Sequence, residues 1–196
     1  MMNFIVLLIL GYFLGSIPFG FIIPKLKGID IREIGSKATS ATNVARALGW
    51  KWGIFSAVLD ILKGAIPAYL SLNYLTNEWQ IISVALIPAF GHIFPVWLKF
   101  KGGRGAGTFA GAAAVLIGPK FFFIFFIIWV LILLATKIMS LTNLLFFWIS
   151  SVLFLIFFPF HYFIYGILGA SLITFALREN IKRLRQGVEP KIPFKF

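Results

Sequence analysis

The stretch at residues 91–108 (GHIFPVWLKFKGGRGAGT) gathers groups that can bind an anion. His92 precedes the cations Lys101 and Arg104, which flank the glycine pair Gly102 and Gly103. Glycines let backbone N–H groups approach a ligand closely, and neighbouring cations favour a phosphate or carboxylate. The glycine order differs from that of a nucleotide P-loop, so the stretch does not indicate an NTPase. The alternative is a positive loop that only fixes membrane orientation.

A second polar stretch, residues 35–46 (GSKATSATNVAR), places hydroxyl and amide side chains next to Arg46. Side chains of this kind can surround an oxyanion or a phosphate. Serine and threonine at these positions could instead cap a helix over residues 41–48. Capping alone does not need so many donors, so the pattern favours a binding role for the group, which comprises Ser36, Thr39, Ser40, Thr42 and Asn43.

Asp60 and Lys63 are two charged residues inside an apolar segment. They are three positions apart and therefore share one helix face. Charges in a membrane span are costly and usually point inward and pair with each other. This predicts a structural role for Asp60 and a position facing the substrate for Lys63.

The basic tail, residues 178–196, contains the candidate residues Arg178, Asn180 and Glu189. Apolar residues recur through its first half with a helical period, which predicts a short amphipathic helix on the membrane surface. We expect Gly187 and Pro190 to end this helix.

The composition predicts an integral membrane protein. Of the 196 residues, 60% are hydrophobic and 18% are aromatic, and the mean hydropathy is +0.97, whereas ordinary soluble domains are roughly 45–50% apolar. The net charge of +12 favours anionic headgroups or substrates as partners over nucleic acid. The absence of cysteine excludes disulfides and thiolate metal sites. With two histidines and six carboxylates, we expect no metal and no cofactor.

We expect one all-α membrane domain, residues 1–196, with seven transmembrane helices. The predicted spans are residues 3–23, 52–72, 80–98, 106–118, 120–136, 141–158 and 162–177. This arrangement places every lysine and arginine except Lys63 and Lys120 on one side. The positive-inside rule makes that side cytoplasmic, with the N-terminus outside and the C-terminus inside. The polar loops 24–51, 99–108 and 178–196 would then share the cytoplasmic face and could form one active site.

At these residues the chain resembles the bacterial acyl-phosphate:glycerol-3-phosphate acyltransferase family over almost its whole length. Residues 35–46 (GS…ATNxxR) resemble the first family motif, and residues 91–105 (GHxFPV…FKGGxG) resemble the second. Residues 180–189 (NIxRLxxGxE) resemble the third, and GSIPFG at 15–20 matches the first span. The sequence departs from the family pattern at Lys37, Ala38, Ser40, Arg104, Ala176 and Leu177.

The resemblance implies transfer of a fatty acyl group from acyl phosphate to the 1-hydroxyl of glycerol 3-phosphate. The products would be 1-acylglycerol 3-phosphate and phosphate, in the first step of phospholipid synthesis. The implied partners are acyl phosphate, glycerol 3-phosphate and membrane lipids. We expect a monomer in the bacterial cytoplasmic membrane, with its active site facing the cytoplasm.

The resemblance and the residue types together assign three groups of site residues. The catalytic group is Ser36, Arg46, His92, Lys101 and Arg104. The substrate-binding group is Thr42, Asn43, Lys63, Gly102, Gly103, Arg178 and Asn180. The structural pair is Asp60 and Glu189. The residues that bind the phosphate of the acyl donor and those that bind glycerol 3-phosphate could be exchanged. The proton of the hydroxyl could pass to His92 or to a substrate phosphate, and we favour the phosphate.

Two other functions stay open at this point. The departures from the family motifs allow a non-catalytic or inactivated lipid-phosphate binder of the same fold. The charged pair within a span would also suit a small anion transporter. Against a transporter, the polar groups gather on one face and the sequence contains no inverted repeat.

Overall fold

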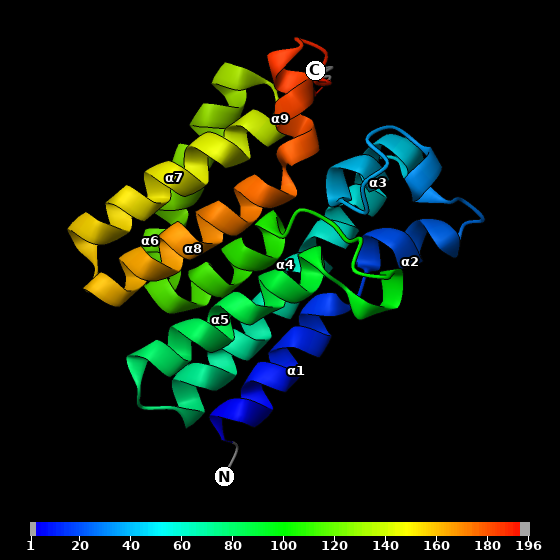
Figure 1. Ribbon diagram of the computed structural model, residues 1–196. Coiled ribbons are helices and arrows are strands. Elements are labelled where there is room, and N and C mark those ends of the chain that lie inside the picture. Colours follow the sequence, from blue (N-terminus) through cyan, green and yellow to red (C-terminus); the bar gives the residue numbers. More distant parts are fainter. Residues whose placement is uncertain (1–2, 193–196) are drawn as a thin grey trace. The chain divides into compact units, whose positions relative to one another are not determined.

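The structure, a computed structural model, describes residues 3–192 (Figure 1), and within this range the regular secondary structure is helical. The elements in chain order are α1 (Phe4–Ser16), α2 (Phe19–Lys25), η1 (Ile31–Glu33), α3 (Ala41–Leu48), α4 (Trp50–Tyr74), α5 (Glu78–Ile93), η2 (Val96–Leu98), α6 (Ala106–Thr136), α7 (Met139–Phe157), α8 (Phe160–Ala176) and α9 (Arg178–Arg185).

Five helical segments within the described residues are long and apolar enough to cross a membrane. They are Phe4–Lys25, Trp50–Tyr74, Glu78–Leu98, Ala106–Thr136 and Met139–Phe157. A sixth is obtained if Phe160–Ala176 is taken together with Arg178–Arg185, from which it is bent by 65°. The prediction of an all-α protein with several spans is confirmed. The number differs from seven because the predicted fourth and fifth spans lie in one helix, α6, and α8 has only 17 residues.

Helix α6 is interrupted at Gly118, whose φ of 76° and ψ of 165° are not helical. The next residue is Pro119, which has no backbone N–H to donate within a helix. The helix therefore consists of two segments, residues 106–117 and 119–136. The interruption lies where the sequence predicted the end of one span and the start of the next.

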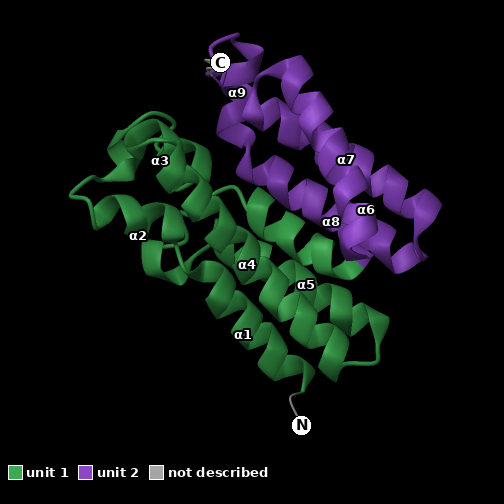
Figure 2. Cartoon of the chain, turned by 180° about the vertical axis from the view of Figure 1, so that it is seen from behind, with its two compact units in different colours: residues 1–116 green, residues 117–196 purple. Residues whose placement is uncertain are grey.

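The chain forms two compact units, of which the first ends at Leu116 and the second begins at Ile117 (Figure 2). In the first unit, α1, α4 and α5 pack against one another and run side by side (Figure 1). Small residues permit the close approach: a Cβ on Gly15 would lie 2.5 Å from Pro88 Cα, and one on Gly91 would lie 3.0 Å from the backbone nitrogen of Ser16. Such glycine contacts are typical of helix packing in membranes.

The loop-rich part of the first unit, containing α2, η1 and α3, lies at the end of the bundle opposite the N-terminus (Figure 1). The chain bends between α1 and α2 at Pro18, which is the N-cap of α2. Between α3 and α4 the backbone turns at Gly49, whose φ of 88° is accessible to glycine at little cost. These bends place the first predicted motif at one end of the helices.

The second unit contains the latter part of α6 together with α7, α8 and α9, and α7 packs along α8. Aromatic side chains fill its interior, including Phe125 and Phe154 with ring centroids 5.3 Å apart. Tyr165 is fully buried beside them. Large apolar side chains such as Phe123 and Leu131 on α6 are exposed, as expected of a surface that faces lipid.

Candidate active site

The first motif is a tight turn built around the side chain of Asn43. Its amide nitrogen donates to the carbonyl oxygens of Ile31, Ile34 and Ala38 at 3.3, 2.9 and 3.1 Å. Its amide oxygen accepts the backbone N–H of Ser36 at 3.1 Å. Asn43 is fully buried, and both ends of its side chain are occupied. These bonds hold residues 31–38 around the Asn43 side chain; contact of Asn43 with substrate stays a prediction.

Helix α3 follows this turn and is capped by a serine, which the sequence analysis gave as the alternative to phosphate binding. Ser40 is the N-cap of α3, and its hydroxyl accepts the backbone N–H of Asn43 at 3.4 Å. Thr42 is half-buried in the first turn of α3, and Arg46 is exposed in the last turn. Arg46 runs beside the turn, because a Cβ on Gly35 would lie 3.7 Å from its Cδ. The turn and the arginine therefore border the same surface.

The glycine loop of the second motif folds back onto the end of α5. The backbone N–H of Gly102 donates to the carbonyl of Ile93 at 3.1 Å, and that of Gly103 donates to the carbonyl of His92 at 3.1 Å. These N–H groups were expected to bind a phosphate; here they donate to carbonyl oxygens, and phosphate binding by them stays a prediction. Of the neighbouring cations, Lys101 is exposed and Arg104 is half-buried.

Glycine at position 103 is required by what lies next to it. A Cβ there would collide with Nε2 of His92 and would lie 2.9 Å from the carbonyl oxygen of Thr39. Thr39 belongs to the first motif, so the first and second motifs meet at Gly103. The polar loops 24–51 and 99–108 therefore lie side by side in the first unit.

A buried charged cluster lies directly behind this loop. The Lys63 ammonium is 3.0 Å from Asp60 Oδ1 and donates to the carbonyl of Ile17 at 2.8 Å. His92 Nδ1 is 3.5 Å from the same carboxylate oxygen and 3.3 Å from the hydroxyl of Thr108. The side chains of Asp60, Lys63 and His92 are each less than a tenth exposed. The predicted ion pair is present, and the close partners of Lys63 are internal; that Lys63 faces substrate stays a prediction.

We predict that Gly103→Ala reduces the acyl transfer implied by the family resemblance at least about tenfold, because the new methyl group would push the loop away from His92 and Thr39. Gly107→Ala is the matched control, since its Cβ would meet Asp60 Cβ at 3.6 Å, an ordinary packing distance. Turnover by both purified variants in detergent tests this. Equal activity of the two variants would show that the position of the loop is unimportant.

The third motif lies in the second unit and is organised by Glu189. Oε1 accepts hydrogen bonds from Asn180 Nδ2 at 2.6 Å and from Ser140 Oγ at 2.8 Å. Oε2 accepts one from Arg183 Nε at 2.7 Å. These contacts tie α9 and the segment after it to α7. Glu189 was predicted to be structural, and joining these elements is a structural role. Arg178, in contrast, is exposed at the start of α9 and stacks on Phe175.

Asn180 remains a candidate ligand-binding residue. It is 7% exposed, and its Oδ1 has no hydrogen-bond partner among residues 3–192. A buried acceptor of this kind is costly unless something donates to it. A hydroxyl or ammonium donor could complete the site.

The carboxyl of Glu189 gives the second unit a predicted dependence on pH. Burial opposes its ionisation, but the bonds from Asn180, Arg183 and Ser140 outweigh burial and lower its pKa below 4.5. A lowered pKa in the folded state contributes stability above pH 4.5 that is lost as the pH falls through the folded value. We expect Glu189→Gln to lower the free energy of unfolding by about 1–3 kcal/mol at pH 7. In thermal unfolding, the difference from the parent chain should shrink below pH 4.5; a constant difference would exclude this role.

Some partners of these residues could not be found from sequence. Thr108 beside His92 and Ser140 beside Glu189 are ordinary hydroxyls in apolar surroundings, and their partners are 16 and 49 positions away. Arg183 could have been predicted as a site residue from the sequence, because it follows Asn180 by one helical turn in the same motif. Among the residues described, no cluster of side chains with metal-binding character occurs.

The comparisons with known proteins cover the same residues. Residues 5–187 match the model of a family described as glycerol-3-phosphate acyltransferase. A protein of that name from Aquifex aeolicus is 39% identical over 191 residues, covering 96% of this chain and 98% of the relative. A protein of the same name from Macrococcus caseolyticus is 38% identical and covers 99% of this chain and all of the relative.

Solved structures give the same result. The crystal structure of PlsY (YgiH), an integral membrane glycerol 3-phosphate acyltransferase, in its glycerol 3-phosphate form, aligns with a TM-score of 0.91 at 36% identity. The alignment covers 96% of this chain and 95% of that one. A second form of the same protein, with lysophosphatidic acid, aligns with a TM-score of 0.89. In sequence and in fold, along nearly its whole length, the chain belongs to the glycerol-3-phosphate acyltransferase family.

Proposed function

We propose that this protein transfers a fatty acyl group from acyl phosphate to the 1-hydroxyl of glycerol 3-phosphate, releasing 1-acylglycerol 3-phosphate and phosphate. The observation that carries the proposal is the meeting of the first two motifs at Gly103, within a chain that matches the family from residue 5 to residue 187. The solved relative is described in forms with glycerol 3-phosphate and with lysophosphatidic acid, which suit the acceptor and the product.

The chemistry needs little more than position and charge. An acyl phosphate already carries a good leaving group, so the protein must hold two anions and stabilise the charge that develops between them. We assign the phosphate contacts to Ser36, Thr42 and Arg46, and the neutralisation of charge to Arg46, Lys101 and Arg104. Arg178 and Asn180 would help to hold glycerol 3-phosphate. Asn43, Gly102 and Gly103 position these groups.

The proposed topology has seven spans, with α6 counted as two because of the interruption at Gly118. The N-terminus would lie outside and the C-terminus in the cytoplasm, since this arrangement leaves nearly all cations inside. The active site would then face the cytoplasm across the bacterial inner membrane. There it can take a soluble acceptor from water and an acyl donor from the bilayer. We expect a monomer.

We predict that His92→Gln leaves measurable turnover, because the hydroxyl proton passes to a substrate phosphate. His92 Nδ1 faces Asp60 and Thr108, and Nε2 lies against Gly103, so the ring is enclosed by the protein. Glutamine keeps a polar side chain in this space but cannot act as a base near neutral pH. Turnover of the folded variant, measured across pH, tests this. Complete loss of turnover with substrate binding intact would assign the proton transfer to His92.

The deciding experiment is phosphate release by the purified protein in lipid nanodiscs supplied with palmitoyl phosphate. We expect release that depends on glycerol 3-phosphate and is matched by formation of lysophosphatidate. Binding of palmitoyl phosphate without turnover would indicate a lipid-phosphate binder and overturn the transferase proposal. Flux of glycerol 3-phosphate into sealed vesicles without chemistry would indicate a transporter. Arg46→Gln provides the inactive control, since it removes a charge at the first motif.

A further inference from the structure

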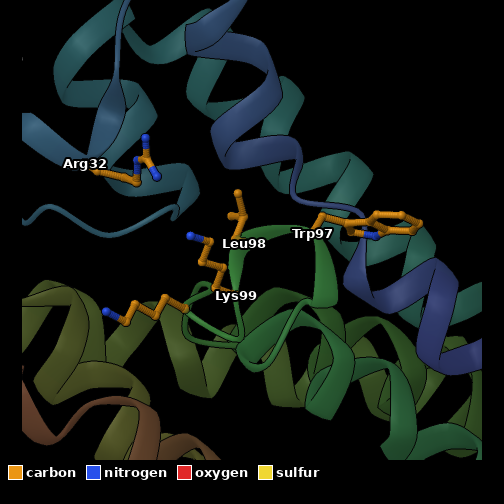
Figure 3. A pocket seen from close by; sticks show the side chains of 5 residues that line it. Arg32, Trp97, Leu98 and Lys99 are labelled. Carbon is orange, nitrogen blue, oxygen red and sulfur yellow. The ribbon is translucent and has the colours of Figure 1, made fainter.

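A basic cleft of about 300 Å³ lies beside the second motif, at the end of α5. Its lining residues come from two distant segments of the first unit: Arg32 from η1, and Trp97, Leu98, Lys99 and Lys101 from η2 and the loop after it. Figure 3 shows Arg32 and Lys99 extending toward the same space from opposite sides. Three of the five lining residues are cations, so the cleft is suited to an anion.

The loop that forms one wall is held in a constrained conformation. Lys99 and Phe100 both have a left-handed backbone conformation, with φ values of 51° and 61°. Two consecutive residues other than glycine rarely adopt this conformation. Backbone hydrogen bonds from Phe100 to Pro95 at 3.0 Å and from Lys101 to Leu98 at 3.1 Å fix this turn. The cations are therefore presented by an ordered backbone.

The opposite wall is fixed by an ion pair. Arg32 donates from Nε and Nη2 to the two oxygens of Asp30 at 2.9 and 2.6 Å. The hydrogen bond from the Arg32 side chain lowers the pKa of Asp30 to about 2, so this carboxylate is charged at neutral pH. Asp30 thus orients one edge of the Arg32 guanidinium. The guanidinium carbon lies 4.9 Å from the centroid of the Phe21 ring. Lys99 and Lys101 keep the cleft positive despite this carboxylate.

The cleft has an apolar rim at Trp97, which lines it and is 60% exposed, and this points to a lipid. Val96 and Phe100 belong to the same segment of chain and are 40% and 59% exposed. The Trp97 indole N–H donates to Ser16 Oγ at 2.9 Å, and its ring lies 6.2 Å from that of Phe13 on the exposed side of α1. A tryptophan next to lysines at the end of an apolar helix is typical of the membrane–water interface. A ligand here would meet cations at one end and hydrocarbon at the other.

We propose that this cleft binds the phosphate headgroup of an anionic membrane phospholipid, next to the active site. Its charge matches an anionic headgroup, and its exposed tryptophan, with Phe100 exposed in the same loop, matches the start of the acyl chains. Glycerol 3-phosphate has no apolar part to meet the rim. The bound lipid would also close the membrane side of the loop that carries Lys101 and Arg104.

The test is native mass spectrometry of the full chain in detergent with added phosphatidylglycerol. The variant Arg32→Gln/Lys99→Gln should bind the lipid about thirtyfold more weakly, because each cation near a lipid surface contributes about 1 kcal/mol. The matched control is Lys25→Gln/Lys51→Gln, which removes the same charge from exposed positions outside the cleft. This control should bind like the parent chain. Thermal unfolding in the same detergent checks that all variants fold.

Two outcomes would overturn the proposal. Equal weakening in the cleft and control variants would mean that the lipid follows net charge alone. Displacement of the lipid by glycerol 3-phosphate at equal concentration would mean that the cleft takes a free phosphate. If the double variant fails to fold, Lys99→Gln alone, at an exposed position, should weaken binding about fivefold. Binding is measured without turnover, so this result is independent of the transferase assay.

Discussion

Asp60→Leu is expected to lower the free energy of unfolding by about 3–5 kcal/mol, the largest stability effect that the structure predicts. The substitution would leave the ammonium of Lys63 buried beside an apolar side chain, with the carbonyl of Ile17 as its remaining close partner. His92 would lose its neighbouring carboxylate at the same time. A buried charge without its counter-ion is costly because no water replaces the lost partner.

The double variant Asp60→Leu/Lys63→Met should recover most of this loss, since it removes both charges and leaves an apolar core. Thermal unfolding of the two single variants and the double variant in one detergent gives the interaction energy. Lys51→Met is the control for removing a lysine from α4, because Lys51 is exposed. We expect it to change stability by less than about 0.5 kcal/mol.

Acyl transfer by the same double variant separates two roles for Lys63. If the lysine is structural, a stable double variant keeps substantial turnover. If the lysine faces substrate, as the sequence suggested, turnover is lost although stability returns. The second result would mean that Lys63 leaves its internal partners when substrate binds.

The ion pair shows how far local sequence reasoning reaches. Two charges three residues apart in an apolar segment predict an ion pair on one helix face, and the distance of 3.0 Å agrees. Lys63 also donates to the carbonyl of Ile17, which is 46 positions away in the sequence. This contact follows from how α1 packs against α4. Sequence spacing defines contacts within a helix, whereas contacts between helices depend on their packing. The bond from Lys63 to Ile17 could not be predicted for this reason.

The glycine loop illustrates a second limit. The run of glycines correctly predicted a close approach of the backbone near residues 102–105. It did not reveal what is approached, because a carbonyl at the end of α5 and a phosphate make the same demand on a backbone N–H. The structure gives Gly102 and Gly103 carbonyl partners. Spans were easier to predict, since long apolar runs are local, and the interruption at Gly118 lies at the boundary between the predicted spans 106–118 and 120–136.

Asn43→Leu is expected to reduce acyl transfer about a hundredfold. Leucine would fill similar space but would leave the carbonyls of Ile31, Ile34 and Ala38 without their donor, and the N–H of Ser36 without its acceptor. Each buried polar group left unpaired costs about 1–3 kcal/mol, so the turn should open. Displacing reacting groups by about 1 Å is enough for a hundredfold loss.

Asn73→Leu is the matched control for this substitution, because Asn73 is exposed at the end of α4 and donates to a single carbonyl. Hydrogen exchange should show faster exchange at residues 31–43 in Asn43→Leu, with protection of α4 and α5 unchanged. Turnover within threefold of the parent chain, despite an opened turn, would contradict this role. Loss of turnover with a closed turn would instead place the amide of Asn43 in direct contact with substrate. The two measurements together therefore decide whether the first motif acts through its fold or through this side chain.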